Sequence, residues 1–151
     1  MQTLDALVVK NLLERLGRLR PESRAVWGRM NAHQMLCHLN DSFDLAMNKR
    51  AATESITIFG RTVMRWVALH TALKWPQGIP TRPEVDQLAG GTRPTEFARD
   101  QAALAAAIQL FVQRPRDFQF SRHPTFGELT EWEWMRWGYL HADHHFRQFG
   151  I

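Results

Sequence analysis

The sequence predicts an all-α protein, most simply a four-helix bundle with an accessory helix and a long loop before the fourth long helix. Apolar residues recur at helical spacing in five separate segments, and no two segments have the pattern of strands that could pair. Two of the helix starts also carry a capping box, at Asn31 and at Thr130. We therefore expect one helical domain over residues 1–151, a length that suits a single hydrophobic core.

The first two helices are expected over residues 3–16 and 32–47. Their apolar residues are spaced three and four apart, so they form one stripe on a helix. Gly17 is a typical C-terminal stop for the first helix. Asn31 is expected to cap the second, because Gln34 stands three residues later and can complete a capping box.

The middle of the chain is predicted to hold two helices separated by a long loop. Residues 51–60 should form a loop or the start of a helix, since no second strand exists to pair with them. Amphipathic helices are expected over 61–74 and 95–113, the latter ending just before Pro115. The intervening residues 75–94 contain four prolines and three glycines, and such long loops usually cross a bundle end or form the wall of a site.

The final helix is predicted to follow a tight turn. Residues 123–127, His-Pro-Thr-Phe-Gly, are typical of such a turn. Thr130 and Glu133 then form the second capping box, and the helix should run to about Phe149.

The composition favours a cytoplasmic globular protein. Hydrophobic residues make up 44% and charged residues 23% of the chain. No apolar run approaches the roughly 20 residues of a membrane span, and Asp5 stands where a signal peptide would be basic. The single Cys37 excludes an internal disulfide and fits a reducing compartment. We therefore expect no membrane partner.

The net charge of +4 is moderate and comes mainly from scattered arginines. It permits nucleic-acid binding, but no recognition motif accompanies it, so we expect no nucleic-acid partner. Two cofactor classes are excluded by pattern. A ferritin-like di-iron site needs Glu-x-x-His and a c-type haem needs C-x-x-C-H, and neither run is present.

Three histidines could form a metal site. His141 and His145 stand four residues apart, so a helix presents both imidazoles on one face. His38 lies on the buried stripe of the second predicted helix and can meet them across the interior. Three neutral imidazoles plus an open position are the ligand set of a catalytic zinc site. Zn²⁺ or Ni²⁺ is the first expectation, with Fe²⁺, Mn²⁺ and Cu²⁺ as alternatives.

The alternative is that these are ordinary histidines. His38 would then be a hydrogen-bonded core residue, and the pair at 141 and 145 would lie on a solvent-facing helix end. Burying three imidazoles without a partner would cost several kcal/mol, which favours the metal interpretation. Cys37 points about 100° away from His38 around the helix, so we interpret it as core rather than as ligand or nucleophile.

Other polar residues are weaker candidates. His144 is three residues from His141 and could line the pocket as a proton carrier, with a hydrogen-bonded or exposed histidine as the alternative. Asp41, with Asp44 and Asp143, could orient the imidazoles, and Asp41 joins His144 as a candidate catalytic residue. His123 either points into the mouth of the bundle or caps its own loop.

Three stretches of the chain resemble the DinB/YfiT-like superfamily, and more narrowly an uncharacterised branch of it. They are residues 27–39 (WGRMNAHQMLCHL), 123–130 (HPTFGELT) and 141–150 (HADHHFRQFG). The resemblance implies a four-helix bundle in which His38, His141 and His145 bind a metal ion. The commoner family ending has Arg directly after the last ligand, where this chain has Phe146, with Arg147 one residue later.

The resemblance also implies a class of chemistry. In characterised relatives the metal activates a low-molecular-weight thiol, such as bacillithiol or mycothiol, for transfer or isomerisation. We therefore expect a metal-dependent transferase of such thiols, or a hydrolase, acting on a small-molecule substrate. The alternative is a non-catalytic metal- or ligand-binding module. The sequence leaves a homodimer open.

Overall fold

The computed structural model describes all of residues 1–151 and contains five α-helices and no β-strand. The predicted all-α class is confirmed. Two short elements accompany the helices, a π-helical turn η1 and a 3₁₀ turn η2. The bounds are α1 (Ala6–Leu16), α2 (Ala32–Ala46), η1 (Gly60–Met64), α3 (Arg65–His70), η2 (Pro83–Val85), α4 (Phe97–Val112) and α5 (Glu131–Gln148).

Both predicted capping boxes are present and fix where α2 and α5 begin. Asn31 accepts a hydrogen bond from the backbone of Gln34, whose side chain accepts one from the Asn31 backbone. Thr130 and Glu133 make the same reciprocal pair at the start of α5. Each box satisfies donors that the first helical turn leaves unpaired, so the two helices that carry the histidines start at defined residues.

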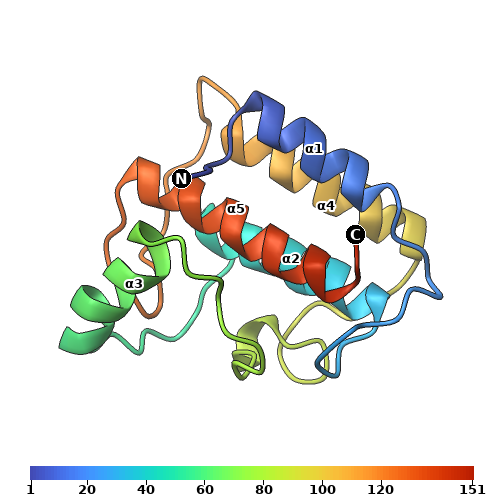
Figure 1. Ribbon diagram of the computed structural model, residues 1–151, viewed down its shortest axis with the longest axis horizontal. Helices are drawn as coiled ribbons and strands as arrows, with labels where there is room; N and C mark the ends of the chain where they lie inside the picture. Colours follow the sequence, from blue (N-terminus) through green and yellow to red (C-terminus); the bar gives the residue numbers. More distant parts are fainter.

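The core lies where α1, α2, α4 and α5 pack against one another (Figure 1). α2 contacts α4 and α5, and α1 also contacts these two helices. Burying a large apolar side chain stabilises the fold by about 1.5–3 kcal/mol, so this region supplies most of the hydrophobic stabilisation. Its largest fully buried side chains include Trp134, Phe43, Phe111, Phe146 and Leu12.

α3 lies beside this packed group, on the left in Figure 1, and the predicted helix over 61–74 was wrong at its C-terminal end. The helix stops at His70 because the guanidinium of Arg136 donates to the carbonyls of Leu69 and Thr71. Those carbonyls are thus satisfied without a further helical turn.

η1 packs closely on the 123–127 turn through Gly60. A Cβ at Gly60 would lie 2.9 Å from the backbone oxygen of Thr125. Only a glycine therefore allows this approach, and it brings η1 and α3 next to the turn that carries His123. No helix is both long and apolar enough to cross a bilayer.

Candidate metal centre

The structure brings the three predicted histidines together. His38 extends from α2, and His141 and His145 extend from α5. Their ligand nitrogens all lie within 4.8 Å of one another, and the Nε2 atoms of His38 and His141 are 3.2 Å apart. The predicted convergence is confirmed, and the group could hold a metal ion.

Hydrogen bonds fix the tautomers of two of these imidazoles. His38 Nδ1 lies 2.9 Å from the carbonyl of Val85, and His145 Nδ1 lies 2.8 Å from Oε1 of Gln148. Both partners are carbonyl oxygens, which only accept, so each Nδ1 carries the proton. Each Nε2 therefore carries no proton, and its lone pair is free to coordinate a metal ion. This arrangement is usual for ligating histidines.

Gln148 is itself held in one orientation. Its Nε2 donates to the carbonyl of Trp27 at 2.8 Å, which leaves Oε1 to face His145. Gly28 makes room for this contact, since a Cβ there would lie 2.5 Å from Gln148 Nε2. Gly28 also has a φ of +83°, which side chains rarely adopt. The loop before α2 thus helps to orient a histidine on α5.

His141 is held by packing instead. Its Nδ1 is buried without a hydrogen-bond partner. Its ring lies between Trp137 and Trp75, with ring centroids 5.0 and 5.9 Å away. These contacts restrict the ring even though no acceptor fixes its tautomer.

The nitrogen geometry fits a divalent ion. Two nitrogens bound at about 2.05 Å with a tetrahedral angle lie about 3.3 Å apart, close to the 3.2 Å between His38 and His141. Burial lowers the pKa of all three imidazoles, and neighbouring histidines lower those of His141 and His145 further. The neutral forms that bind metals are therefore favoured over protonated ones.

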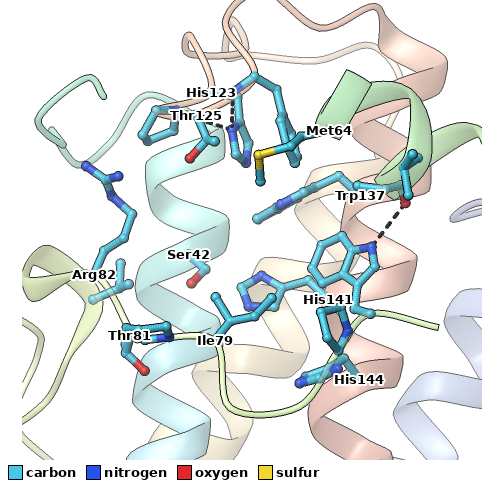
Figure 2. Close-up of a pocket in the computed structure, with 18 of the residues that line it drawn as sticks. Ser42, Met64, Ile79, Thr81, Arg82, His123, Thr125, Trp137, His141 and His144 are labelled. Atoms are coloured by element: carbon cyan, nitrogen blue, oxygen red, sulfur yellow. Dashed lines mark hydrogen bonds between the residues drawn. The ribbon is translucent and has the colours of Figure 1, made fainter. Parts of the chain in front are cut away.

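The histidines line a cavity of about 610 Å³ with mainly apolar walls (Figure 2). η1, α3 and the connection after α3 supply much of this lining, as expected for a loop that forms the wall of a site. Side chains from these segments include Phe59, Val63, Met64, Val67, Trp75, Ile79 and Pro80. An open coordination position would therefore face a mainly apolar space.

His144 also lines this cavity, as predicted. Its ring contacts Trp27 edge-on at a centroid distance of 5.9 Å, and its Nδ1 is buried without a partner. Burial lowers the pKa of His144, which favours a neutral ring able to accept a proton. Its catalytic role stays a prediction.

His123 takes both of the positions considered for it. Nδ1 accepts hydrogen bonds from the backbone N–H groups of Thr125 and Phe126, each at 3.1 Å, and so caps the turn. The same ring lines the cavity. Figure 2 shows it at the opposite end of the pocket from His141 and His144.

Asp41 does not hydrogen-bond to the imidazoles, and a catalytic role for it stays a prediction. Its buried carboxylate accepts hydrogen bonds from the backbone and hydroxyl of Thr92, from Gln87 and from Arg50. No hydrogen bond joins it to an imidazole. Asp41 instead anchors the loop that contains η2 and thereby positions the Val85 carbonyl behind His38.

Asp44 and Asp143 do not orient the imidazoles either. Asp143 forms a 2.8 Å ion pair with Arg15, which ties α5 to α1, and a second 2.8 Å pair with Arg147 within α5. Arg147 is thus a structural partner, and Phe146 in the position before it is fully buried core. The sequence offered these carboxylates as candidates to orient the imidazoles, whereas the structure has a backbone carbonyl behind His38 and an amide behind His145.

A second group, His33, Cys37 and Asp100, could also hold a metal ion by proximity. Its members already bond one another, with His33 Nε2 2.7 Å and Cys37 Sγ 3.6 Å from the same Asp100 oxygen. Burial, with Asp100 nearby, raises the pKa of the Cys37 thiol to about 12, so Cys37 is not a nucleophile. Sequence spacing missed this group because Asp100 is distant in the chain.

Fold and site together define a helical protein with a buried three-histidine cluster in an apolar cavity. The chain belongs to the family described as protein of unknown function (DUF1569), whose model matches residues 2–150. Neither the curated proteins nor the solved structures contain a match to the chain.

Proposed function

We propose that this protein is a metal-dependent enzyme that transfers a low-molecular-weight thiol, or hydrolyses a bond, on a small molecule. His38, His141 and His145 are the proposed ligands of a divalent ion, with Zn²⁺ or Ni²⁺ preferred. One observation carries the proposal. The Val85 carbonyl and the Gln148 amide leave two Nε2 atoms unprotonated beside a third imidazole, at the edge of an apolar cavity.

The residues of the site suit this chemistry. A divalent ion at three imidazoles lowers the pKa of a thiol or water in its open position. A substrate seated between the apolar walls would displace water from that position. His144 lines the same cavity with a neutral ring and is the proposed proton acceptor.

We further propose that α1, α2, α4 and α5 form a DinB-like four-helix bundle with α3 as the accessory helix. The mutual packing of these four helices and the three stretches that resemble the superfamily support this assignment. The thiol chemistry rests on the same resemblance, and a hydrolase is the variant that uses water instead.

One observation favours the alternative of a non-catalytic binding module. The cavity lining contains no carboxylate, so proton transfer would depend on histidines alone. A protein that holds metal but shows no turnover would fit this alternative.

Metal analysis of protein purified without an affinity tag tests the proposal. We expect about one equivalent of a divalent metal per chain by mass spectrometry, and a loss of at least ~90% in His38→Ala or His145→Ala. His33→Ala, on the same helix but outside the cavity, is the matched control and should retain the metal. Metal that survives His38→Ala and disappears in His33→Ala would instead place the ion at the second cluster.

A survey of thiol–electrophile pairs and of ester and amide substrates then separates enzyme from binding module. Turnover that requires metal and drops about 100-fold in His144→Ala supports the enzyme. Stoichiometric metal without turnover for any pair supports the module.

A further inference from the structure

We propose that His123 is a fixed hydrogen-bond donor that holds a carbonyl oxygen of an uncharged, apolar substrate at the far end of the cavity from the three-histidine cluster. This inference rests on the proposed function, because it names the class of small molecule on which that site acts. It adds a defined polar contact point to a cavity whose walls are mainly apolar.

The hydrogen bonds of the turn decide where the His123 proton lies. Nδ1 accepts from two backbone N–H groups, those of Thr125 and Phe126, so Nδ1 carries no proton. The neutral ring must then carry its proton on Nε2. That N–H makes no hydrogen bond within the chain, and the ring lines the cavity. A ligand is therefore the available acceptor.

The His123 Nε2 stays protonated, and the ring that carries it is held in place by packing. Burial lowers the pKa of His123 to about 3, so the ring stays neutral at physiological pH and does not switch its tautomer. The ring stacks on Phe126 at a centroid distance of 4.4 Å and an interplanar angle of 14°. Trp134 and Trp137 contact it at 5.7 and 6.0 Å. A donor held in this way needs little ordering when a ligand binds.

The remaining lining selects against charged ligands. It contains no acid, so a cation would find no counter-charge. Lys74 and Arg82 are the only permanent cations of the lining, and Lys74 is exposed. Arg82 donates to the Ser55 hydroxyl and to the Thr53 carbonyl and lies 3.5 Å from the Glu84 carboxylate, while its Nε is buried without a partner. The Glu84 carboxylate thus offsets part of the Arg82 charge, which favours an uncharged ligand over an anion.

Size and position define the ligand further. The volume of about 610 Å³ falls within the range of about 300–1,000 Å³ typical of pockets for small organic molecules. Trp137 contacts His123 at 6.0 Å and His141 at 5.0 Å, measured between ring centroids. In Figure 2 Trp137 lies between these two histidines. A molecule lying along Trp137 can thus present its carbonyl to His123 and its other end to the histidine cluster.

The test compares two probes that differ in the acceptor, 2-acetylnaphthalene and 2-ethylnaphthalene. We expect the wild-type chain to bind the carbonyl compound about 3- to 10-fold more tightly, the usual net effect of one hydrogen bond. His123→Asn is the informative variant. Its Oδ1 can still accept from the backbone two and three residues later. Its shorter Nδ2 amide then lies where the ring has Cδ2, so no donor remains at the position of Nε2. In this variant the ratio of the two dissociation constants should fall to about one.

An infrared measurement gives a second readout that a purely structural role would not change. With a ¹³C-labelled carbonyl, the stretching band of bound 2-acetylnaphthalene should shift to lower wavenumber in the wild type and not in His123→Asn. If the variant does not fold, the wild-type band measured after removal of the metal decides the matter, because a shift that persists without metal cannot come from coordination. An unshifted band, or a failure of the wild type to bind either probe, would overturn the proposal.

Each measurement is made on the protein as purified and again after dialysis against a chelator, with metal content determined in the same samples. A preference that disappears on chelation but survives His123→Asn would place the carbonyl at the metal and overturn this inference only. A preference that persists in a chain found to bind no metal would support the His123 donor while the proposed enzyme fails.

Discussion

At the scale of single residues, the hydrogen-bond partner of an imidazole decides which of its nitrogens is free to bind a metal ion. Gln148 bridges His145 on α5 and the Trp27 carbonyl in the loop before α2. The amide is locked at both ends, so it holds the His145 proton on Nδ1 and keeps Nε2 unprotonated. Partners of this kind are typically worth a factor of 10 to 100 in metal affinity.

Removing this partner should weaken metal binding without removing a ligand. We expect Gln148→Ala to lower the metal affinity by about 10- to 100-fold, measured by competition with a chelator of known affinity. Gln148→Glu keeps an acceptor for His145 and loses only the donor to Trp27, so it should retain most of the affinity. Equal losses in both variants would contradict a role through the imidazole.

The ligands could be predicted from the sequence, whereas their partners could not. The four-residue spacing of His141 and His145 is a local property of a helix, and His38 shares a buried stripe. The Val85 carbonyl reaches His38 only because the loop after α3 folds back over α2, and no spacing encodes such a contact. The aspartates considered for orienting the imidazoles have other partners. Asp41 accepts a hydrogen bond from Thr92, and Asp143 pairs with Arg15.

At the scale of elements, α3 is attached to α5 through the buried carboxylate of Glu133, in addition to the contacts of Arg136. Glu133 accepts a pair of hydrogen bonds from Arg65 and one from His70, at 2.5–3.0 Å. It also caps α5 through Thr130. One side chain thus joins the start of the helix that carries the ligands to a wall of the cavity. The predicted helix over 61–74 missed this because side-chain contacts, not periodicity, end α3 at His70.

This carboxylate should make stability depend on pH. Burial alone would raise the pKa of Glu133, but hydrogen bonds from Arg65, His70 and Thr130 lower it from 4.5 to about 2. The unfolded chain then binds more protons than the folded chain between these values, so stability falls as the pH falls through that window. At pH 3 the loss from this group should be about 2 kcal/mol.

Urea unfolding at pH 6 and pH 3 measures this loss. The wild type should lose about 2 kcal/mol more than Glu133→Gln, which cannot titrate there. Glu131→Gln is the matched control, since Glu131 lies in the same first turn with a half-exposed side chain. Glu131→Gln should lose as much unfolding free energy between pH 6 and pH 3 as the wild type. Parallel losses in the wild type and Glu133→Gln would contradict the anchoring role.

At the scale of the whole molecule, the proposed metal site joins α2 and α5, two helices whose histidines lie about a hundred residues apart in the sequence. A ligand that binds only the folded state stabilises it by mass action, by about 2.7 kcal/mol at 100 times its Kd. A metal ion that links α2 and α5 should therefore stabilise the whole protein against unfolding.

Chelation should lower the melting temperature of the wild-type protein by roughly 5–10 °C, with recovery when Zn²⁺ or Ni²⁺ is restored. Differential scanning calorimetry measures the shift. His38→Ala should melt at one temperature with or without chelator, while His33→Ala should still respond. A chelator-dependent shift that persists in His38→Ala would contradict the proposed ligand set.

The all-α class was predictable because five segments have the helical period and two have capping boxes, all of which are local properties. The arrangement as a DinB-like bundle and the relationship to that superfamily stay predictions. The cavity itself could not be foreseen, since its walls come from η1, α3 and the following loop, whose positions depend on Gly60 and Glu133.

The three imidazoles line the same cavity that would hold the small molecule, and His38 and His145 are otherwise buried. An ion bound at the proposed site and a small molecule in the cavity would therefore use the same opening. On the proposed function, a molecule lying along Trp137 would stand between the ion and solvent. Such an occupant should slow the removal of the metal by a competing chelator.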